Sequence, residues 1–525
     1  MRRLPIVVLM AAVAGGSLAP SASARPRTRS QETNRTAPVP ADLNGDGRSD
    51  LVVGVPGEDH EDLEGAGAVN VIYSGSEGLS SERNQLLSQG IDAVAGFAES
   101  GANLGRSIAI GDFDGDGFDD LAAGAPGTDV MGVTDAGQVL IVEGSKDGLV
   151  PGHSTLWHQG VPNIEGELSE LDSFGASLAT GDFNGDGYSD LAVGAHQDED
   201  RGAVQILYGS GDGLSSDDDQ IWTQDSDGVR GEDNPSTQEF FGYQLAVANF
   251  GRGKQDDLAI GAPGEVDDGA FWGGAVHVLF GSDEGVTAAG NQYLTQDVEG
   301  VADQVEDSDR FGYSLAAANF GKSRHADLAI GVPNESLVSW DEAGAVHVVY
   351  GSKRGLRSKG SQYFHQDRRG LADYAEDYDL FGRALAAGFF GGGRHADLAV
   401  GVPSEDFDGA PDAGAVHVLI GSERGLSPRK GSFLKQPEPE TDDQFGYTMT
   451  TGNYGRGPSW DLAVAAPGES IGELAGAGEV GVFYGSRNGR YEANGFESWN
   501  QDSDGIMGEA ASGDFFGDSF PLDFD

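Results

Sequence analysis

Hydrophobic residues occur along this chain in short runs, separated by turns that are rich in glycine and aspartate. In the run from Ala275 to Phe280, the side chains of Val276, Val278 and Phe280 alternate with other residues and so share one face of a strand. Four such runs follow one another at residues 175–180, 190–195, 203–208 and 220–223. Long helical periodicity is absent, so the pattern predicts short antiparallel strands joined by turns.

The group of four runs recurs seven times, in units of 64 to 72 residues. Two short motifs mark the units. A Phe-Gly pair begins at residues 174, 241, 311, 381, 445 and 516, with Leu104-Gly105 as a variant. A Gly-Ala-Pro or Gly-Val-Pro triplet begins at residues 54, 124, 261, 331 and 401, with departures at Gly194-Ala-His196 and Ala465-Ala-Pro467. Four short antiparallel strands per unit are typical of a propeller blade, and a continuous solenoid is the rival architecture.

The two ends of the repeat region favour a closed ring over a solenoid. The first unit lacks the Phe-Gly strand that precedes the loop in the other units, and the segment Phe516–Phe524 supplies a matching strand at the other end. Pairing these ends removes the exposed sheet edges of an open stack. The sequence therefore predicts an all-β, seven-bladed β-propeller of four-stranded antiparallel blades over residues 41–525, closed by the C-terminal strand pairing with the first unit.

An acidic nine-residue loop occurs in each of the first three units. Side-chain oxygens stand at positions 1, 3, 5 and 9, and glycine stands at positions 4 and 6. Closely spaced carboxylates repel one another, and Ca²⁺ relieves this repulsion because it accepts six to eight oxygen ligands in a flexible geometry. Position 7 would contribute its backbone carbonyl. The predicted ligands are Asp42, Asn44, Asp46, Arg48, Asp50, Asp112, Asp114, Asp116, Phe118, Asp120, Asp182, Asn184, Asp186, Tyr188 and Asp190.

The alternative is that these loops are solvated acidic turns, since Asp and Gly are common turn residues. Three copies at a spacing of 70 residues favour about three Ca²⁺ sites instead. The second loop has aspartate at all four side-chain positions, whereas the first and third each have one asparagine, so the second is expected to bind Ca²⁺ most tightly. Position 12 is Val53, Ala123 or Val193 where an EF-hand has glutamate, and a strand follows instead of a helix.

The loops of the last four units keep the aspartate at position 9 but lose the ligands at positions 3 and 5, and they gain basic residues. One hypothesis is that a basic side chain, such as that of Lys322 near Asp327, replaces the charge of the metal. The alternative is that these are exposed loop charges, worth at most about 1 kcal/mol. The sequence leaves both open.

The N-terminal segment and the composition bear on where the chain acts. Arg2 and Arg3, an apolar run from Leu4 to Ala14 and the Ala22-Ser-Ala24 site predict a secretory signal peptide over residues 1–24. Residues 25–40 are polar and proline-bearing and are expected to form a disordered leader. No stretch is long and apolar enough to span a bilayer. We therefore expect a secreted, extracellular protein, and its lack of cysteine excludes disulfides. A net charge of −54 argues against nucleic-acid binding.

With Phe-Gly, Gly-Ala-Pro and the acidic loop in one 70-residue unit, the chain resembles the FG-GAP repeat family. That family includes the propeller of integrin α-subunits and similar exported bacterial proteins, and the resemblance covers about residues 38–525. It implies a seven-bladed β-propeller with Ca²⁺ in hairpin loops on one face, and an extracellular recognition role. The acidic loops stand in the first three units here but in later units of integrin propellers, so the place of a ligand surface does not carry over.

Two classes of function follow. No Gly-x-Ser-x-Gly or His-Glu-x-x-His motif occurs, and a thiol nucleophile is excluded. The prediction is a monomeric, non-catalytic, adhesion-like recognition module for an extracellular protein or glycan, with Ca²⁺ stabilising the hairpin loops of blades one to three. The alternative is a secreted hydrolase or an enzyme-associated propeller. The resemblance extends to the propeller of glycosylphosphatidylinositol-specific phospholipase D, in which catalysis belongs to a separate domain.

Overall fold

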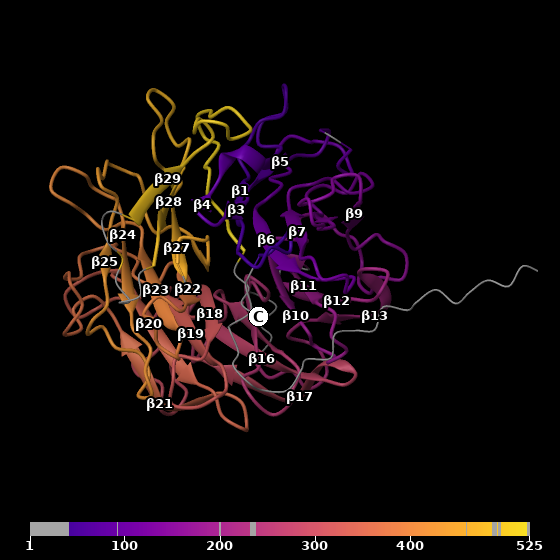
Figure 1. Cartoon of the computed structure of the whole chain (residues 1–525). Coiled ribbons are helices and arrows are strands. Elements are labelled where there is room, and N and C mark those ends of the chain that lie inside the picture. Colours follow the sequence, from indigo (N-terminus) through magenta and orange to yellow (C-terminus); the bar gives the residue numbers. More distant parts are fainter. Residues whose placement is uncertain are drawn as a thin grey trace, which may run out of the picture.

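The computed structural model describes residues 41–91, 93–198, 201–231, 238–457, 459–485, 491 and 495–521. The predicted signal peptide (1–24) and leader (25–40) lie outside these residues. The described part contains 29 strands and one short 3-10 helix, η1 (Ser81–Arg83). In Figure 1 the sheets follow one another in chain order around a common centre, from indigo through magenta and orange to yellow. The described residues contain no helix long and apolar enough to cross a membrane.

Each blade is a sheet of neighbouring antiparallel strands, numbered in chain order from the ring axis outward. Blade one contains β1 (Leu51–Val55), β2 (Ala68–Ile72) and β5 (Gln85–Leu87), beside a small ribbon of β3 (Ser74–Gly75) and β4 (Gly78–Leu79). Blades two and three contain β6 (Ser107–Gly111), β7 (Asp120–Ala125), β8 (Gln138–Val142), β9 (Ser154–Trp157), β10 (Ser177–Gly181), β11 (Asp190–Ala195), β12 (Ala203–Tyr208) and β13 (Ser215–Trp222).

Blades four and five contain β14 (Gln244–Ala248), β15 (Asp257–Ala262), β16 (Ala275–Ser282), β17 (Gly285–Leu294), β18 (Ser314–Ala318), β19 (Asp327–Val332), β20 (Ala345–Tyr350) and β21 (Arg357–Phe364). Blades six and seven contain β22 (Leu385–Gly388), β23 (Asp397–Val402), β24 (Ala415–Leu419), β25 (Phe433–Leu434), β26 (Met449–Gly452), β27 (Asp461–Ala466), β28 (Glu479–Phe483) and β29 (Phe496–Trp499). The predicted all-β, seven-bladed propeller is confirmed.

The strands of the third unit show where the predicted bounds hold and where they shift. The runs predicted at 190–195 and 203–208 are β11 and β12. The run predicted at 220–223 is the end of β13, which begins five residues earlier at Ser215. A register shift between Ile206 and Tyr208 lets pairing continue outward, so that Tyr208 lies opposite Ser215. Hydrophobic alternation does not reveal this extension, because residues 215–219 are Ser-Ser-Asp-Asp-Asp.

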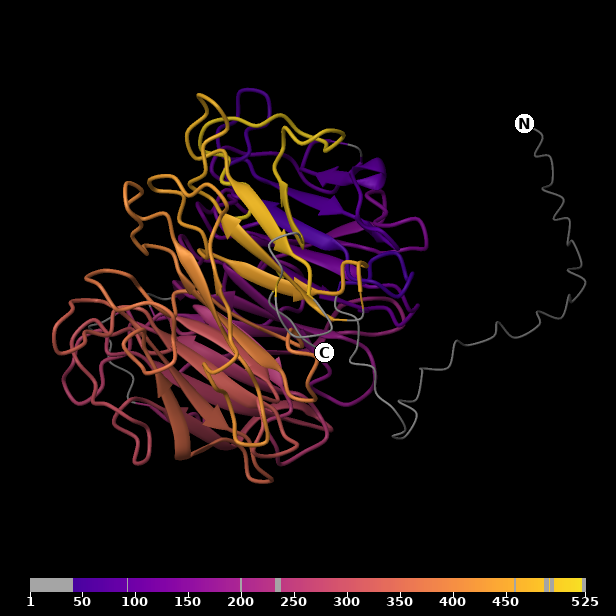
Figure 2. The same cartoon turned by 60° about the vertical axis from the view of Figure 1, so that its left-hand side comes forward.

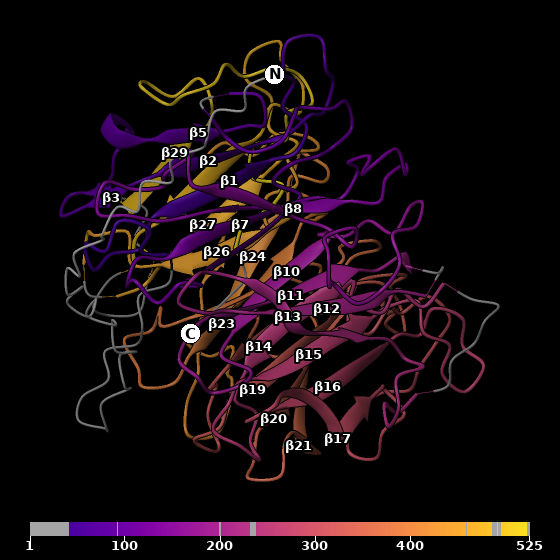
Figure 3. The ribbon, with the colours of Figure 1, turned by 90° about the vertical axis from the view of Figure 1, so that its right-hand side faces the viewer.

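The ring closes where the sequence predicts it. Gly54 of β1 and Ser519 form an antiparallel bridge, with Gly54 N–H donating to the Ser519 carbonyl (2.9 Å) and Gly517 N–H donating back to Gly54 (3.1 Å). The C-terminal segment thus takes the innermost place in blade one, which would otherwise hold three strands. Figures 2 and 3 show the yellow C-terminal blade lying beside the indigo first blade.

The Phe-Gly pairs explain how neighbouring blades are joined. The six phenylalanines of these pairs are fully buried and lie in apolar clusters shared by adjacent blades. The second residue after each pair supplies a hydroxyl in five blades, and this hydroxyl donates to the carbonyl of the next blade's Phe-Gly or Leu-Gly glycine. These bonds run from Ser107 to Gly175 (2.6 Å), Ser177 to Gly242 (2.6 Å), Ser314 to Gly382 (2.7 Å), Thr448 to Gly517 (2.6 Å) and Ser519 to Gly105. A chain of hydrogen bonds thus surrounds much of the ring axis.

The antiparallel strands sort the loops onto two faces. Loops from strand one to two, and from strand three to four, end on one face, which we call the nonapeptide face because it carries the nine-residue loops. Loops from strand two to three, and from strand four to the next blade, end on the other, which we call the hairpin face. Its strand-two-to-three loops form short hairpins closed by paired residues: His60 and Leu63, Val130 and Val133, Asp267 and Ala270, Leu337 and Trp340, Phe407 and Ala410, Ile471 and Leu474.

Candidate metal centres and the opposite face

The second nonapeptide joins β6 to β7 and brings three carboxylates together. Oxygens of Asp112, Asp114 and Asp116 all lie within 4.8 Å of one another. Gly115 (φ 73°) and Gly117 (φ 96°) adopt the left-handed region that turns the loop sharply enough for this convergence. Asp116 is exposed, whereas Asp112 and Asp114 are half-buried. The three carboxylates therefore line a shallow acidic site that opens to solvent.

One atom of this site fits a cation better than it fits the protein alone. Oδ1 of Asp112 is buried and accepts no hydrogen bond. Burial, followed by repulsion from Asp114 and Asp116, raises the pKa of Asp112 to about 6. A buried carboxylate oxygen without a donor is costly, and a hard divalent cation is the partner that three converging carboxylates favour. The donor set of the second loop therefore fits Ca²⁺.

The first and third nonapeptides are arranged differently, because an asparagine replaces one carboxylate. In the first loop, both oxygens of Asp42 accept backbone hydrogen bonds, from Asp46 N–H (2.9 Å) and Gly47 N–H (2.8 Å). Nδ2 of Asn44 donates to Asp50 (3.1 Å). In the third loop, Asn184 Nδ2 donates to Asp186 (3.0 Å). Among the described residues, only the second loop brings three acidic side chains into one group.

The aspartate at position 9 serves the backbone in every blade. In the second loop, Asp120 accepts from Phe113 N–H (3.0 Å) and from Gly144 N–H (2.8 Å) at the end of strand three. The equivalent carboxylates of the other six blades also bind the backbone at the end of strand three, and burial raises the pKa of each. They are Asp50, Asp190, Asp257, Asp327, Asp397 and Asp461. The sequence did indicate this structural role, because the aspartate at position 9 is retained in the four loops that lack the other ligands.

Position 7 joins one nonapeptide to the next. The ring of Phe118 covers Gly45 of the preceding loop so closely that a Cβ on this glycine would lie 2.7 Å from a ring carbon. Tyr188 covers Gly115 in the same way (2.6 Å). The N–H groups of Phe118 and Tyr188 donate to the position-5 carboxylates of their own loops. Glycine at position 4 is therefore required for a close approach between blades as well as for the turn.

Backbone hydrogen bonds reinforce these contacts. The residue at position 8 donates its N–H to the position-1 carbonyl of the preceding blade. These bonds run from Ser189 to Asp112 (3.0 Å), Asp256 to Asp182 (3.1 Å), Ala326 to Asn249 (3.1 Å), Ala396 to Asn319 (2.9 Å) and Ser49 to Asn453 (3.1 Å). The nonapeptides are thus part of the contacts between blades, and a cation bound in one loop would act on two blades.

In the last four blades, the basic residues of the loops do not form ion pairs with the position-9 aspartates within the described part of the chain. In blades four, five and seven, one charged group of the loop lies over an aromatic ring: Arg252 over Phe280 (4.5 Å), Lys322 over Tyr350 (3.5 Å) and Arg456 over Tyr484 (4.0 Å). Close ion pairs with the position-9 aspartates are therefore absent from these described loops, although, against the larger effect of burial, the charge of Lys322 still acts to lower the pKa of Asp327 and that of Arg456 the pKa of Asp461. Backbone donors hold the aspartate instead, and the cations cover the neighbouring rings.

The hairpin face is the more apolar of the two faces. Ten large hydrophobic side chains of the described residues are exposed, and all ten stand in loops of the hairpin face. They are Phe97, Met131, Leu171, Phe271, Trp272, Val338, Tyr374, Tyr378, Met507 and Phe515. Scattered single hydrophobic residues are normal on a surface, but their confinement to one face is not expected by chance. The sequence alone does not reveal this common face, because the ten residues stand in loops that are far apart along the chain.

Comparison with known proteins supports the repeat assignment. The FG-GAP repeat model matches residues 34–72, 104–142 and 174–207, and each stretch contains one of the three acidic nonapeptides. The chain is a seven-bladed β-propeller with FG-GAP repeats in its first three blades. The blades outside the matched stretches keep the fold without the acidic loop, which shows that the propeller depends on the strand pattern more than on the loop sequence.

The FG-GAP propeller is also similar to parts of larger proteins. It is 33% identical over 234 residues to a phosphatidylinositol-glycan-specific phospholipase D of Rattus norvegicus, covering 42% of this chain and 25% of that protein. It is 33% identical over 233 residues to integrin alpha-PS2 of Drosophila melanogaster, covering 43% of this chain and 15% of that protein. A solved structure described as "Structure of Dos1 propeller" aligns at 14% identity with a TM-score of 0.35, covering 71% of this chain and 68% of that one. The propeller thus spans at most a quarter of the length of the phospholipase D and integrin relatives.

Proposed function

We propose that this FG-GAP propeller is a secreted, Ca²⁺-binding recognition module whose hairpin face contacts an extracellular protein or glycan. The observation that carries the proposal is the confinement of the exposed hydrophobic side chains to that face. Aromatic side chains such as Phe271, Trp272 and Tyr374 are typical anchors of protein interfaces and of carbohydrate stacking. The predicted signal peptide, the similarity to integrin α-subunits and the lack of known catalytic motifs support an extracellular, non-catalytic role.

Ca²⁺ has a structural role in this proposal. The ligands are the oxygens of the nonapeptides at 42–50, 112–120 and 182–190, of which the second is the best formed. Ca²⁺ would neutralise the repulsion among Asp112, Asp114 and Asp116, and it would hold the loop in the conformation that contacts the next blade. Binding to the folded state alone contributes about 2.7 kcal/mol at a hundredfold excess of ligand over Kd.

Calorimetric titration with Ca²⁺ tests the metal sites. We expect Asp116→Ala to lose the tightest binding event, while Asp212→Ala, which changes an exposed aspartate of a strand-three-to-four turn, keeps it. A chelator should lower the melting temperature of the wild type and change that of Asp116→Ala less. Retention of the tightest site in Asp116→Ala would contradict the ranking of the loops.

A glycan array and a pull-down from native secretions, each with and without chelator, test recognition. Serine at Phe271, Val338 and Tyr374 should weaken capture of any partner that is found, whereas Lys353→Ala on the nonapeptide face serves as the matched control. A partner lost through the control and kept by the triple variant would place recognition on the opposite face and refute the proposal.

The second candidate is an enzyme or an enzyme-associated propeller. One observation favours it, namely the match to proteins named phosphatidylinositol-glycan-specific phospholipase D. Incubation of the purified chain with a phosphatidylinositol-glycan substrate, followed by analysis of the products, distinguishes the two. Turnover that survives mutation of the nonapeptides would favour this candidate.

A further inference from the structure

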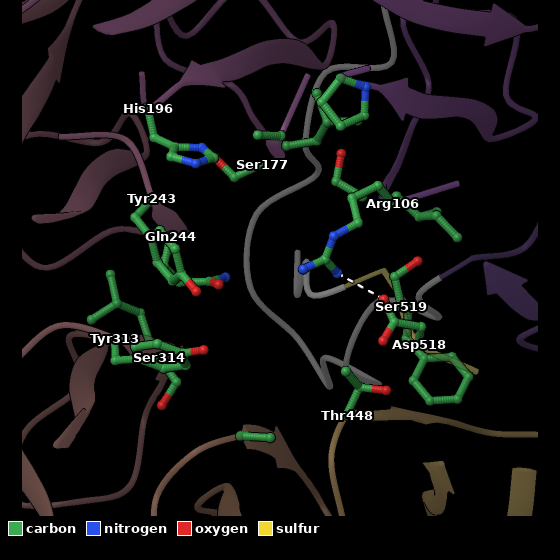
Figure 4. Close-up of a pocket in the computed structure, with 18 of the residues that line it drawn as sticks. Arg106, Ser177, His196, Tyr243, Gln244, Tyr313, Ser314, Thr448, Asp518 and Ser519 are labelled. Atoms are coloured by element: carbon green, nitrogen blue, oxygen red, sulfur yellow. Dashed lines mark hydrogen bonds and ion pairs between the residues drawn. The ribbon is translucent and has the colours of Figure 1, made fainter. Parts of the chain in front are cut away.

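A cavity of about 390 Å³ lies on the ring axis and is lined by the residue that follows each Phe-Gly or Leu-Gly pair. Figure 4 labels four of these seven residues, namely Arg106, Tyr243, Tyr313 and Asp518. Blades four, five and seven contribute Tyr243, Tyr313 and Tyr447, and blade three contributes only Ala176. Blades two, six and one contribute the charged residues Arg106, Arg383 and Asp518. The Phe-Gly pair itself repeats around the ring, but the residue after it differs from blade to blade, so polar and apolar groups line the cavity asymmetrically. Its volume is in the usual range for small-ligand sites.

The charges at the axis do not balance. Arg106 and Asp518 form an ion pair at 2.8 Å, which Figure 4 shows as a dashed line. Arg383 has no carboxylate within ion-pair distance among the described residues. Its guanidinium carbon lies 4.8 Å from the Tyr313 ring centre and 4.5 Å from that of Tyr447, and it donates a hydrogen bond to the Tyr313 hydroxyl. Among the described residues that line the cavity, two arginines and one aspartate leave one net positive charge.

The other polar groups of the cavity do not change this sum. His196 lies against Tyr243 with ring centres 5.5 Å apart, and burial followed by the charge of Arg106 lowers the pKa of His196 to about 4. It is therefore neutral at pH 7. Burial also raises the pKa of Tyr243, which stays a neutral hydroxyl. Several hydroxyls at the cavity edge, such as that of Ser177, already donate to the neighbouring blade. The free binding capacity is concentrated on Arg383.

Of the two arginines among the described residues that line the cavity, Arg383 is the one without a carboxylate partner, in a chain with a net charge of −54. Its donors match the geometry of a carboxylate, which they can bind through two parallel hydrogen bonds. A dianion such as phosphate would leave one negative charge uncompensated in a partly desolvated cavity, at a considerable cost. The tyrosine rings offer an apolar wall for the body of a ligand. The charge count thus favours a monoanion.

We propose that the axial cavity binds a small organic monocarboxylate of about hexuronate size, with its carboxylate on Arg383 and its ring against the tyrosines. This site is independent of the Ca²⁺ loops, since the Phe-Gly strands begin at the hairpin face and the nonapeptides lie on the other. It also does not depend on which partner contacts the exposed hydrophobic side chains.

Isothermal titration of the full chain in Ca²⁺-containing buffer at low salt tests the site, with glucuronate as the probe and glucose and inorganic phosphate as comparators. We expect one glucuronate per chain and no binding of glucose. Arg383→Gln should weaken glucuronate binding by about tenfold or more, because a hydrogen bond to a charged group is lost. Arg424→Gln, a change of an exposed arginine outside the cavity, should leave the affinity unchanged.

Asp518→Asn provides a test that does not depend on loss of binding. It frees Arg106 and raises the net charge of the cavity from one to two, so glucuronate should bind more tightly and phosphate should gain more than glucuronate. Arg383→Lys keeps the charge but not the fork of donors, and it should retain part of the affinity if Arg383→Gln fails to fold. Absence of glucuronate binding to the wild type, equal binding of glucose, tighter binding of phosphate, or unchanged affinity in both Arg383→Gln and Asp518→Asn would overturn the proposal. None of these results would affect the metal sites or the hairpin face.

Discussion

Replacement of Asp327 by alanine is expected to loosen blade five by removing two backbone hydrogen bonds at once. Asp327 is fully buried at position 9 of its loop. Its carboxylate accepts from Gly351 N–H (2.8 Å) and Gly321 N–H (3.2 Å), and thereby joins the loop to the end of β20. Alanine leaves both donors without a partner in a site that water does not reach.

The magnitude follows from those two donors. A buried donor left unsatisfied costs about 1–3 kcal/mol, so two cost about 2–6 kcal/mol. The carboxylate itself is costly to bury, and burial raises the pKa of Asp327 to about 7. Relief of this desolvation offsets part of the loss, which places the expected destabilisation near the lower end, at about 2 kcal/mol. Asp327→Asn keeps one acceptor and should cost less.

Native-state hydrogen exchange is the suitable assay, because a ring of seven sheets need not unfold in a single step. A loss of about 2 kcal/mol corresponds to roughly thirtyfold faster exchange of the Gly351 and Gly321 amides. The matched control is Lys322→Met, which removes the cation over Tyr350 and should cost only about 0.5–1 kcal/mol because Lys322 is exposed.

The pH dependence gives a second measurement. The folded-state pKa of Asp327 lies above its unfolded value of 3.8, so the folded state holds a proton that the unfolded state has lost between about pH 4 and pH 7. The contribution of this group to stability therefore falls as the pH rises through that window, and Asp327→Asn should lack this slope. Unchanged exchange at Gly351 in Asp327→Ala would refute the backbone role and the charge-replacement hypothesis alike. An equal loss of stability in Lys322→Met would favour charge replacement over the backbone role.

Three further predictions concern other parts of the ring. Gly54→Ala should weaken ring closure by about 1–3 kcal/mol, because the Cβ of the new alanine would lie 2.0 Å from Ser519 Oγ. Hydrogen exchange of the Gly517 amide measures this loss, and Gly152→Ala, whose Cβ would meet nothing within 4 Å, is the control. Burial and then Asp309 raise the pKa of Glu335 to about 9, so the contribution of Glu335 to wild-type stability falls as the pH rises from about 4.5 to 9. Glu335→Gln should therefore flatten the pH profile of the unfolding free energy, and an unchanged profile would contradict this. Phe118→Ala should weaken Ca²⁺ binding in the first loop, because the wild-type Phe118 ring covers Gly45 of that loop. Calorimetric titration measures this effect, and unaltered binding at all sites would exclude coupling between neighbouring loops.

The fold could be predicted from the sequence because the same physical constraints recur in every unit. A Phe-Gly pair buries an aromatic ring and lets the backbone of two blades approach, and each recurrence reinforces the assignment of the others. The closing strand was predictable for the same reason, since a missing element in the first unit and an extra one at Phe516 are visible as sequence. The length of β13 was not, because its outer residues are polar and carry no alternation.

The candidate sites were only partly predictable. Spacing identified Asp112, Asp114 and Asp116 as neighbours, because a nine-residue loop leaves little freedom. It did not show that Asp120 bonds to Gly144, since that contact joins residues 24 positions apart. The axial cavity was not predicted at all. The residue after Phe-Gly varies from blade to blade, and only the ring geometry brings Arg106 and Asp518 together across 412 positions.

The hydroxyl-to-carbonyl chain around the axis has two interruptions, at Gln244 and Ala384. At these junctions, between blades four and five and between blades six and seven, contacts with aromatic rings join the blades instead: the ring of Tyr243 lies against that of Tyr313, and the guanidinium of Arg383 lies over the ring of Tyr447. Such contacts are less directional than a hydrogen bond and tolerate small sliding movements. Under a stretching force in the plane of the ring, the propeller should therefore part first at these two junctions and release blades five and six as a pair.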